Sequence, residues 1–189
     1  MADYSLIADT GLSLIRMLRE GLVPDLVPHT DGIGLAHPQD KGDMSLSLYL
    51  YDIKENMDAR SSEMVDQGDR LRYPPLALDL FYLITAHSSS DVLTRAIDEQ
   101  RIIGKTMQLL HDHNILQDDD LMGALRGSGT TIRIVKEELP LDTLMGLFPN
   151  GPYKLSLGCR VGPVYLDSTR TKPVSRVRER QFNLKPKPR

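Results

Sequence analysis

The most restrictive feature of the sequence is an apolar run at residues 73 to 87, which reads YPPLALDLFYLITAH. Its side chains alternate with the two-residue period of a β-strand, and both resulting faces are mostly apolar. Such a strand is covered on both faces, so it lies inside its sheet or beneath an interface. Pro74 and Pro75 can only begin it, because neither can donate a hydrogen bond to a neighbouring strand. We therefore predict a central strand over residues 75 to 86.

A single charged residue interrupts this run. Asp79 lies between Leu78 and Leu80, close to Phe81. A carboxylic acid among apolar side chains is found in many active sites. It is also found in structural ion pairs, where a neighbouring Arg compensates the buried charge. Both roles are compatible with the local sequence.

Residues 44 to 53 show a second strand pattern, with an aliphatic face and a face of Ser and Tyr that includes Tyr49 and Tyr51. Tyr combines an apolar ring with a polar hydroxyl, so a face of this kind often contacts a partner. We expect this strand to pair with residues 75 to 86 as a wide antiparallel hairpin. The highly charged residues 54 to 72 between the two strands are then either a mobile loop or a binding arm.

The rest of the chain alternates between helix and strand patterns. Apolar stripes predict helices over residues 3 to 20 and 91 to 113. The stripe expected to be buried in the second helix consists of Val92, Leu93, Ala96, Ile97, Ile102, Ile103, Met107 and Leu110. The remaining predicted elements are a short strand near 33 to 37, a helical turn at 121 to 126, a strand at 130 to 139, a short helix at 140 to 148 and a strand at 153 to 161. Grouped strands with helices outside them indicate an α+β fold, with a mixed, mainly antiparallel sheet and helices packed on one face.

Charge is distributed unevenly along the chain. Residues 169 to 189 carry eight Lys and Arg against the single acidic residue Glu179, whereas residues 1 to 168 carry 15 basic and 25 acidic groups. We therefore predict one domain over residues 1 to 168 and a basic tail or arm over residues 169 to 189. An acidic body with a basic tail indicates that the tail contacts an acidic surface, such as that of another copy.

Within this tail, Arg176, Arg178 and Arg180 place three positive charges on one side of an extended segment. Nucleic-acid binding usually needs a larger basic face with stacking aromatic rings, and the acidic body opposes it, so we predict no nucleic-acid partner. A tail that adds a strand to the sheet edge of a neighbour fits the alternation better. A solvated terminus is the simpler alternative.

Patterns that could bind a metal, a cofactor or a substrate are weak. His111 and His113 are two residues apart on a helix and point about 200° apart, so they cannot share a metal ion. Residues 127 to 131, GSGTT, lack the Gly-Lys-Ser/Thr ending of a phosphate loop and precede a strand. Cys159 lies on the apolar face of a strand without a His partner. We predict no catalytic residues, no metal and no cofactor, and therefore no enzyme.

The lone cysteine excludes an intrachain disulfide and favours a reducing compartment. The N-terminal residues lack the basic and apolar regions of a signal peptide. No window approaches the ~20 apolar residues of a membrane span. We expect assembly in the cytoplasm without direct membrane insertion.

Several segments resemble a known protein family. The resemblance runs from about residue 5 to residue 168 and rests on six motifs. They are LYLYDIKEN at 48–56, RYPPLALDL at 72–80, IGKTMQ at 103–108, ELPL at 138–141, PYKLS at 152–156 and VGPV at 161–164. In order and spacing they are similar to the N-terminal domain of the cap, or tail-terminator, proteins of extracellular contractile injection systems, the phage-tail-like particles of the virulence-cassette and antifeeding-prophage type.

The resemblance implies a structural function. Such proteins form a six-fold ring on the distal end of the inner tube and sheath, where the ring ends tube growth and anchors the last sheath ring. It implies a hexameric homo-oligomer whose partners are the inner tube protein and the sheath protein, within a particle that can be released. The alternatives are a head–tail adaptor or tail-completion protein of a contractile phage, which shares the ring architecture, and a small-ligand-binding enzyme that shares the fold.

In a ring subunit the plainer role for Asp79 is a salt bridge or capping bond under a helix or at a subunit contact. A closed ring also needs two different contact patches on each subunit. The residues that we expect to contribute to partner interfaces are Tyr49, Tyr51, Asp79, Arg176, Arg178 and Arg180.

Overall fold

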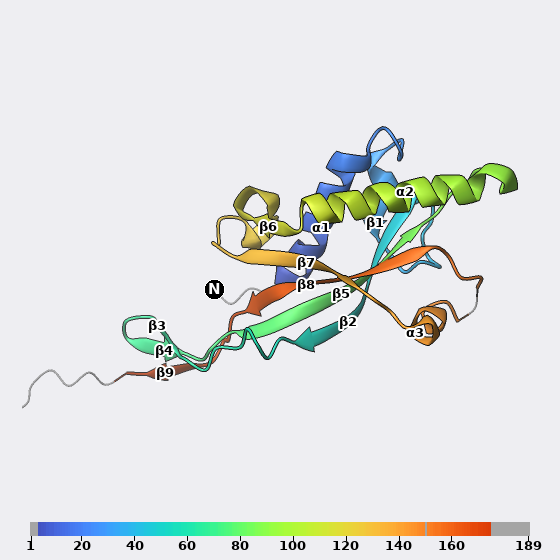
Figure 1. The fold of residues 1–189 in the computed structure, drawn as a ribbon. Helices are drawn as coiled ribbons and strands as arrows, with labels where there is room; N and C mark the ends of the chain where they lie inside the picture. Colours follow the sequence, from blue (N-terminus) through green and yellow to red (C-terminus); the bar gives the residue numbers. More distant parts are fainter. Residues whose placement is uncertain (1–3, 150, 175–189) are drawn as a thin grey trace, which may run out of the picture.

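The computed structural model describes residues 4–149 and 151–174. Its main body is a six-stranded sheet in the order β1-β2-β5-β8-β7-β6 (Figure 1). The strands are β1 (Ile33–Leu35), β2 (Leu46–Glu55), β5 (Leu76–Ala86), β6 (Ile115–Gln117), β7 (Thr131–Glu137) and β8 (Ser156–Leu166). β1 runs parallel to β2, and all other pairs in this sheet are antiparallel. The predicted α+β fold with a mixed, mainly antiparallel sheet is confirmed.

β5 is the central strand that the apolar run predicts. It pairs with β2 on one side and with β8 on the other, and the hairpin with β2 is antiparallel as expected. Every residue from 77 to 86 is buried. Leu80 and Leu83 project to opposite faces, and both side chains are fully buried. The strand is therefore covered on both sides.

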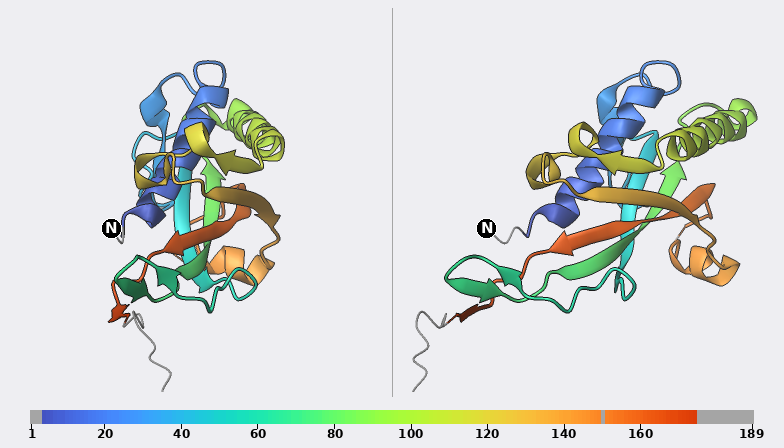
Figure 2. Two further views of the ribbon diagram at one scale, coloured as in Figure 1. Left: turned by 90° about the vertical axis from the view of Figure 1, so that its left-hand side faces the viewer. Right: turned by 60° about the vertical axis from the view of Figure 1, so that its left-hand side comes forward.

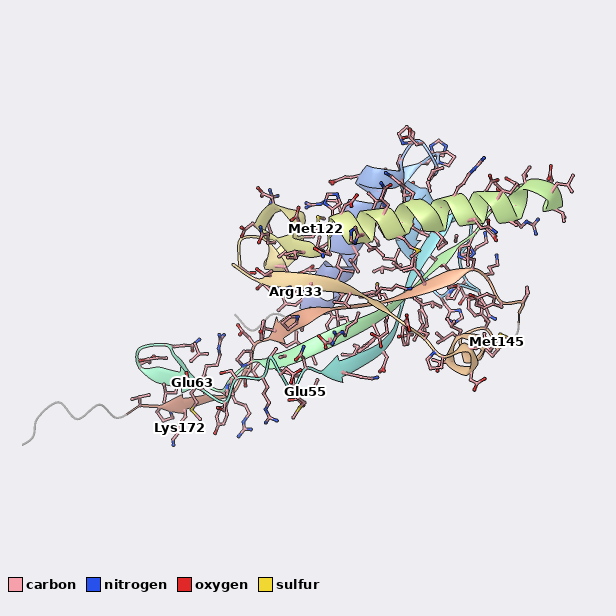
Figure 3. The ribbon with its side chains drawn as sticks, viewed as in Figure 1. Glu55, Glu63, Met122, Arg133, Met145 and Lys172 are labelled. Carbon is pink, nitrogen blue, oxygen red and sulfur yellow. The ribbon has the colours of Figure 1, made fainter. Side chains whose placement is uncertain are left out.

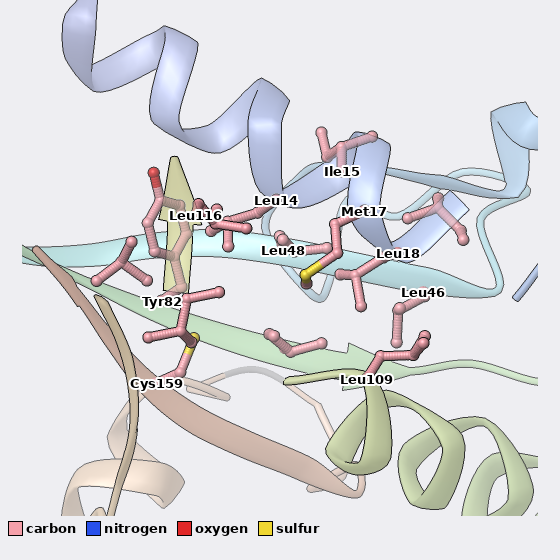
Figure 4. Close-up of a cluster of buried hydrophobic side chains, with 14 of the residues drawn as sticks. Leu14, Ile15, Met17, Leu18, Leu46, Leu48, Tyr82, Leu109, Leu116 and Cys159 are labelled. Carbon is pink, nitrogen blue, oxygen red and sulfur yellow. The ribbon is translucent and has the colours of Figure 1, made fainter. Parts of the chain in front are cut away.

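Two helices close the hydrophobic core over one face of the sheet. α1 (Leu6–Leu22) and α2 (Val92–Asp112) lie on the same side of it (Figures 1 and 2). Figure 4 shows Leu14 and Leu18 of α1 above Leu48 of β2 and Tyr82 of β5, and all four side chains are at most 1% exposed. Burial of such side chains contributes about 25 cal/mol for each Å² of apolar surface removed from water.

The first helix extends further than its sequence pattern predicts. α1 begins at Leu6 and continues to Leu22, whereas residue 3 of the predicted range lies outside the described residues. Gly21 lies inside the helix, where an added Cβ would overlap with the side chain of Leu109 on α2. The absence of a side chain at position 21 lets α1 and α2 approach each other closely.

The buried stripe predicted for the second helix is only partly correct. Ile102 and Ile103 are buried, but Val92 and Leu93 are 82% and 86% exposed. The first turns of α2 extend beyond the edge of the main sheet, as Figure 1 shows. Apolar periodicity identifies one face of a helix, but it does not show where the sheet beneath that helix ends.

The connection between α2 and β7 also differs from its prediction. The expected helical turn at 121–126 is replaced by two 3-10 turns, η2 (Asp118–Asp120) and η3 (Gly123–Leu125). β6 precedes them as an additional strand that the sequence pattern did not indicate. Further along the chain, α3 (Leu141–Gly146) lies within the predicted short helix.

Two bulges interrupt the sheet on either side of β5. In β2, Leu50 pairs with Tyr82 and Asp52 pairs with Phe81, so Tyr51 is an extra residue. In β8, Val161 pairs with Leu80 and Val164 pairs with Leu78, so the two residues 162 and 163 lie opposite Asp79 alone. Each bulge shifts the alternation of its strand by one residue. The alternation that predicts the strand is broken by the bulge after residue 161. The predicted strand therefore ends there, although β8 continues to Leu166.

A second, three-stranded sheet projects beyond the end of the main sheet (Figures 1 and 2). It consists of β3 (Val65–Asp66), β4 (Arg70–Arg72) and β9 (Thr171–Pro173) in the order β3-β4-β9. We call these three strands the arm. Residues 54–72 therefore contain part of an ordered arm, and the first residues of the basic tail complete it. The domain boundary at residue 168 stays a prediction.

Candidate assembly surfaces

Asp79 is held by side chains from two neighbouring segments. Its Oδ2 lies 3.3 Å from Nη1 of Arg160 on β8, and its Oδ1 accepts a hydrogen bond of 3.0 Å from Nδ2 of Asn56. Asp79 is only 8% exposed, and the guanidinium of Arg160 compensates its charge. The expected ion pair with an Arg is present, but it lies within one chain and on the sheet face opposite α1 and α2 rather than beneath these helices. A place for Asp79 at a subunit contact stays a prediction.

The bulge in β8 makes room for this carboxylate. A Cβ on Gly162 would overlap with Oδ1 of Asp79 and would lie 2.9 Å from the carbonyl oxygen of Leu78. Both atoms belong to β5, whose backbone is fixed by strands on each side. Glycine at position 162 is therefore a requirement of the buried ion pair.

Asn56 connects the ion pair to the chain that leads into the arm. Its backbone N–H donates to the carbonyl oxygen of Ala77 at 2.9 Å, and its Oδ1 accepts from the N–H of Ala59 at 2.8 Å. Asp79 thus sets the direction in which the chain leaves β2. We call Asp79, Arg160 and Asn56 the carboxylate anchor.

Replacing Asp79 with Asn is expected to lower the free energy of unfolding by about 1 kcal/mol, because the partly exposed Arg160 loses its ionic partner. Asn preserves the shape of the side chain, so the main sheet should persist while residues 56–64 become more accessible. Urea denaturation and the rate of proteolysis at residues 56–64 measure these two effects. A variant with normal assembly and unchanged proteolysis would contradict the role of the anchor.

The arm is fastened by contacts between its two chain segments. Nη1 of Arg72 lies 2.6 Å from Oδ2 of Asp167, and the guanidinium of Arg170 stacks 4.3 Å from the ring centre of Tyr73. The N–H of Val174 donates to the carbonyl oxygen of Asp69 at 3.2 Å. Charged side chains lie on the arm and next to it, as Lys172 of β9 and Glu63, just before β3, show in Figure 3. The arm is an ordered, polar projection suited to contact a charged surface.

Tyr49 and Tyr51 lie on the face of the sheet opposite α1 and α2, because the adjacent Leu48 and Leu50 point into the core. The ring of Tyr49 meets His37 edge-on at 4.7 Å between centroids. Tyr51 lies 6.2 Å from Phe81 on β5.

Charges surround this aromatic face. Nζ of Lys54 lies 4.8 Å from the centre of the Phe81 ring. Burial, followed by the negative charges of Glu137 and Asp52, raises the pKa of Tyr51 to about 12, so its hydroxyl stays protonated near neutral pH. Aromatic rings beside charges are typical of protein contact surfaces.

Only three of the six predicted interface residues lie in the part of the chain that the structure describes. Tyr51 and Asp79 lie on the same face of the sheet, on either side of Phe81. Tyr49 lies further along β2 on that face. The positions of Arg176, Arg178 and Arg180 lie outside the described residues. A contribution of any of these residues to an interface stays a prediction.

A buried polar cluster lies at the opposite end of β5. Nε2 of His87 is 2.8 Å from Oγ of Ser47, and Nδ1 is 3.3 Å from Nζ of Lys154. The ammonium group can only donate, so Nδ1 accepts and the proton of the neutral ring is on Nε2. Burial, followed by the charges of Lys154 and Lys41, lowers the pKa of His87 to about 3.

The residues considered for chemistry occupy structural positions. Cys159 is fully buried, and burial raises the pKa of its thiol to about 12. Ser128, in the glycine-rich turn at residues 127–131, donates a hydrogen bond from Oγ to the carbonyl oxygen of Leu125 at 2.7 Å. Within residues 4–149 and 151–174, no group of three or more His, Cys, Asp or Glu side chains is placed to bind a metal. The same part of the chain contains no helix that is long and apolar enough to cross a membrane.

Sequence reasoning missed Asn56 and Arg160 as partners of Asp79. Asn56 lies three residues beyond the predicted end of a strand, in a kind of position where an Asn side chain often bonds to the backbone. Arg160 lies on the polar face of a strand, but its pairing with Asp79 depends on the register between β5 and β8. Only the fold reveals that register.

The sequence of this chain matches a known family model. The model of the Pvc16 N-terminal domain matches residues 10–180. The chain belongs to the Pvc16 N-terminal domain family. This match includes the carboxylate anchor and all the strands of both sheets.

Two solved structures share the fold of this Pvc16 N-terminal domain. One is the sheath/tube terminator, in its extended state, of the PVC extracellular contractile injection system, with 22% identity and a TM-score of 0.58 over 95% of this chain and 64% of that one. The other is the tube-terminating cap of the anti-feeding prophage, with 21% identity and a TM-score of 0.60 over 94% of this chain and 61% of that one. This chain thus spans less than two thirds of the length of either structure. A comparison with curated protein sequences gives no match.

Proposed function

We propose that this chain is a cap, or tail-terminator, protein of a phage-tail-like contractile injection system. The observation that carries the proposal is a fold shared over 94–95% of the chain with a sheath/tube terminator and a tube-terminating cap. In this role, a hexameric ring of the protein sits on the distal end of the inner tube and sheath. The ring ends tube growth and anchors the last sheath ring, and its partners are the tube and sheath proteins. The subunits assemble in the cytoplasm, as part of a particle that can be released.

The shape of the molecule supports this role. A closed ring needs two different patches on each subunit. The arm lies at one end of the molecule, and the exposed first turns of α2 lie at the other (Figure 1). Val92 and Leu93 supply an apolar surface there, whereas the arm is charged. These properties suit a structural subunit, and we propose no enzymatic activity.

The proposal is tested by combining the purified chain with the inner tube protein. We expect light scattering to show a ring-sized oligomer, and electron microscopy to show tubes that stop growing when the chain is added. A monomer whose melting temperature rises with a small ligand would favour the enzyme alternative instead. A ring that leaves tube growth unchanged would favour a head–tail adaptor. Genes for sheath, tube and baseplate proteins next to the gene for this chain would argue against such an adaptor.

Removing residues 175–189 is expected to weaken sheath attachment or ring closure, because it deletes six of the eight basic residues of the tail and leaves the arm complete. Co-sedimentation with sheath and tube at low salt measures the loss, which should shrink at high salt as charge is screened. Deletion from residue 169 is the comparison, since it also removes β9. Unchanged ring formation and sheath attachment after the shorter deletion would contradict a role for the tail.

A further inference from the structure

The second half of β7 is an open sheet edge. β6 pairs with residues 131–133 of β7, whereas β8 pairs with residues 133–137 on the other side. The N–H of Ile134 donates to the carbonyl oxygen of Asn114, so it points away from β8. Backbone groups alternate in direction along a strand, so the N–H and C=O of Lys136 point the same way. Asn114 therefore lies opposite Ile134, and among the described residues no segment pairs with that side of residues 135–137, which form the open edge.

An apolar groove lies directly beside this open edge, between β7 and the second half of α2. Its volume is about 380 Å³. Its apolar lining includes Met107, Leu110, Ile134, Leu157 and Cys159. Met107 is 46% exposed at its rim, while Ile134 and Leu157 are almost completely buried. A strand added to β7 would direct every second side chain into this groove, because side chains alternate between the two faces of a sheet.

The tail of the protein contains a segment of matching pattern. Residues 181–184 read Gln-Phe-Asn-Leu, so an extended backbone places Phe182 and Leu184 on one face and the two amides on the other. Pro186 follows closely and cannot donate to a ladder, so it ends the strand. Residues 181–183 equal the open edge at residues 135–137 in length, and Leu184 follows directly after them.

Charge selects the direction of this strand. In the antiparallel direction, Arg180 and the arginines before it lie beside Glu137 and Glu138, just past the end of the open edge. In the parallel direction they lie beside Arg133, where β6 already occupies the edge. Opposite charges favour the first arrangement. It also continues the antiparallel direction of β6.

We propose that residues 181–183 of one copy add an antiparallel strand to residues 135–137 of a second copy, with Phe182 in the groove beneath α2 and Leu184 at the end of the groove, beside Asn114. This inference rests on the proposed ring, in which each subunit offers one patch to the next. The last strand before the tail, β9, belongs to the arm of its own copy. The tail therefore starts from the arm of one subunit and reaches the groove between α2 and β7 of a neighbour.

Cross-linking between full-length chains tests this contact. One chain carries Met107→Cys and the other carries Leu184→Cys, and the mixture is treated with a short bismaleimide. The unmodified chain is the blank, because its own cysteine is buried. Met145→Cys is the matched control, because Met145 on α3 is 51% exposed and Met107 is 46% exposed. We expect about tenfold more covalent dimer with the Met107 variant than with the Met145 variant.

A second substitution tests the open edge. Lys136→Pro removes a backbone N–H that points away from β8, so it should reduce the covalent dimer to the control level. Because proline also fixes φ, the melting temperature of this variant is measured alongside and should stay within a few degrees of that of the unmodified chain. Equal amounts of dimer from the two Cys positions, or no effect of the proline on the amount of dimer, would each overturn the contact. Light scattering on the same samples separates the two claims. A ring without the cross-link overturns only this inference, and a monomer without it overturns the ring as well.

Discussion

Replacing Gly162 with Ala is expected to lower the free energy of unfolding by about 3 kcal/mol, the upper end of the cost of overpacking a core. The added methyl group would overlap with the carboxylate of Asp79 and crowd the carbonyl oxygen of Leu78. Neither atom can retreat, because β5 is paired on both sides and Asp79 is bonded to Asn56 and Arg160. Urea denaturation followed by circular dichroism measures the loss.

Gly104 provides the matched control for this substitution. It lies on the exposed side of α2, where an added Cβ meets nothing within 4 Å, so Gly104→Ala should stabilise the chain by up to about 1 kcal/mol. The double variant with Asp79→Ala and Gly162→Ala should lose less than the sum of its single changes, since the methyl then enters vacated space. Strict additivity would show that the carboxylate and the glycine are not coupled.

The second large effect is a loss of stability in mild acid caused by His87. The unfolded chain protonates this ring near pH 6.5, but the folded chain keeps it neutral down to about pH 3. Between these values the unfolded state binds more protons, so stability rises with pH there. The contribution is complete above about pH 6.5 and is lost as the pH falls towards 3, by at most about 1.4 kcal/mol per pH unit.

Denaturation in urea at pH 7 and pH 5 measures this slope. His87 alone should account for about 2 kcal/mol of the difference. His87→Gln places an amide near Oγ of Ser47 and cannot be protonated, so the variant should lose less stability than the unmodified chain over the same interval. Equal losses in the two proteins would show that His87 does not cause the slope.

Elements fixed by short-range pattern could be predicted from the sequence, and β5 is the clearest example. Its two apolar faces require cover on both sides, and the structure provides it. The exposure of Leu93 could not be predicted, because periodicity identifies a helix face without locating the sheet below it. The pairing of Arg72 in β4 with Thr171 in β9 joins residues far apart in sequence, and no local signal records such a pairing.

The carboxylate anchor was likewise predictable only in part. Asp79 was identifiable because a carboxylate stands out in an apolar run. Its partners Asn56 and Arg160 come from a strand end and from another strand, so their approach depends on two registers. Both registers contain bulges, which reverse the alternation from which a sequence pattern is read.

The paired bulges also set a rule for which length changes this sheet can accept. Removing Tyr51 alone, or one residue of the pair at 162–163, would shift the register of the rest of that strand by one residue. Its core side chains would then point to the opposite face of the sheet. Insertions between residues 57 and 64 carry no such penalty, since no strand of the described chain lies there. Length changes are therefore easier to accommodate in residues 57–64 than in the strands on either side of β5.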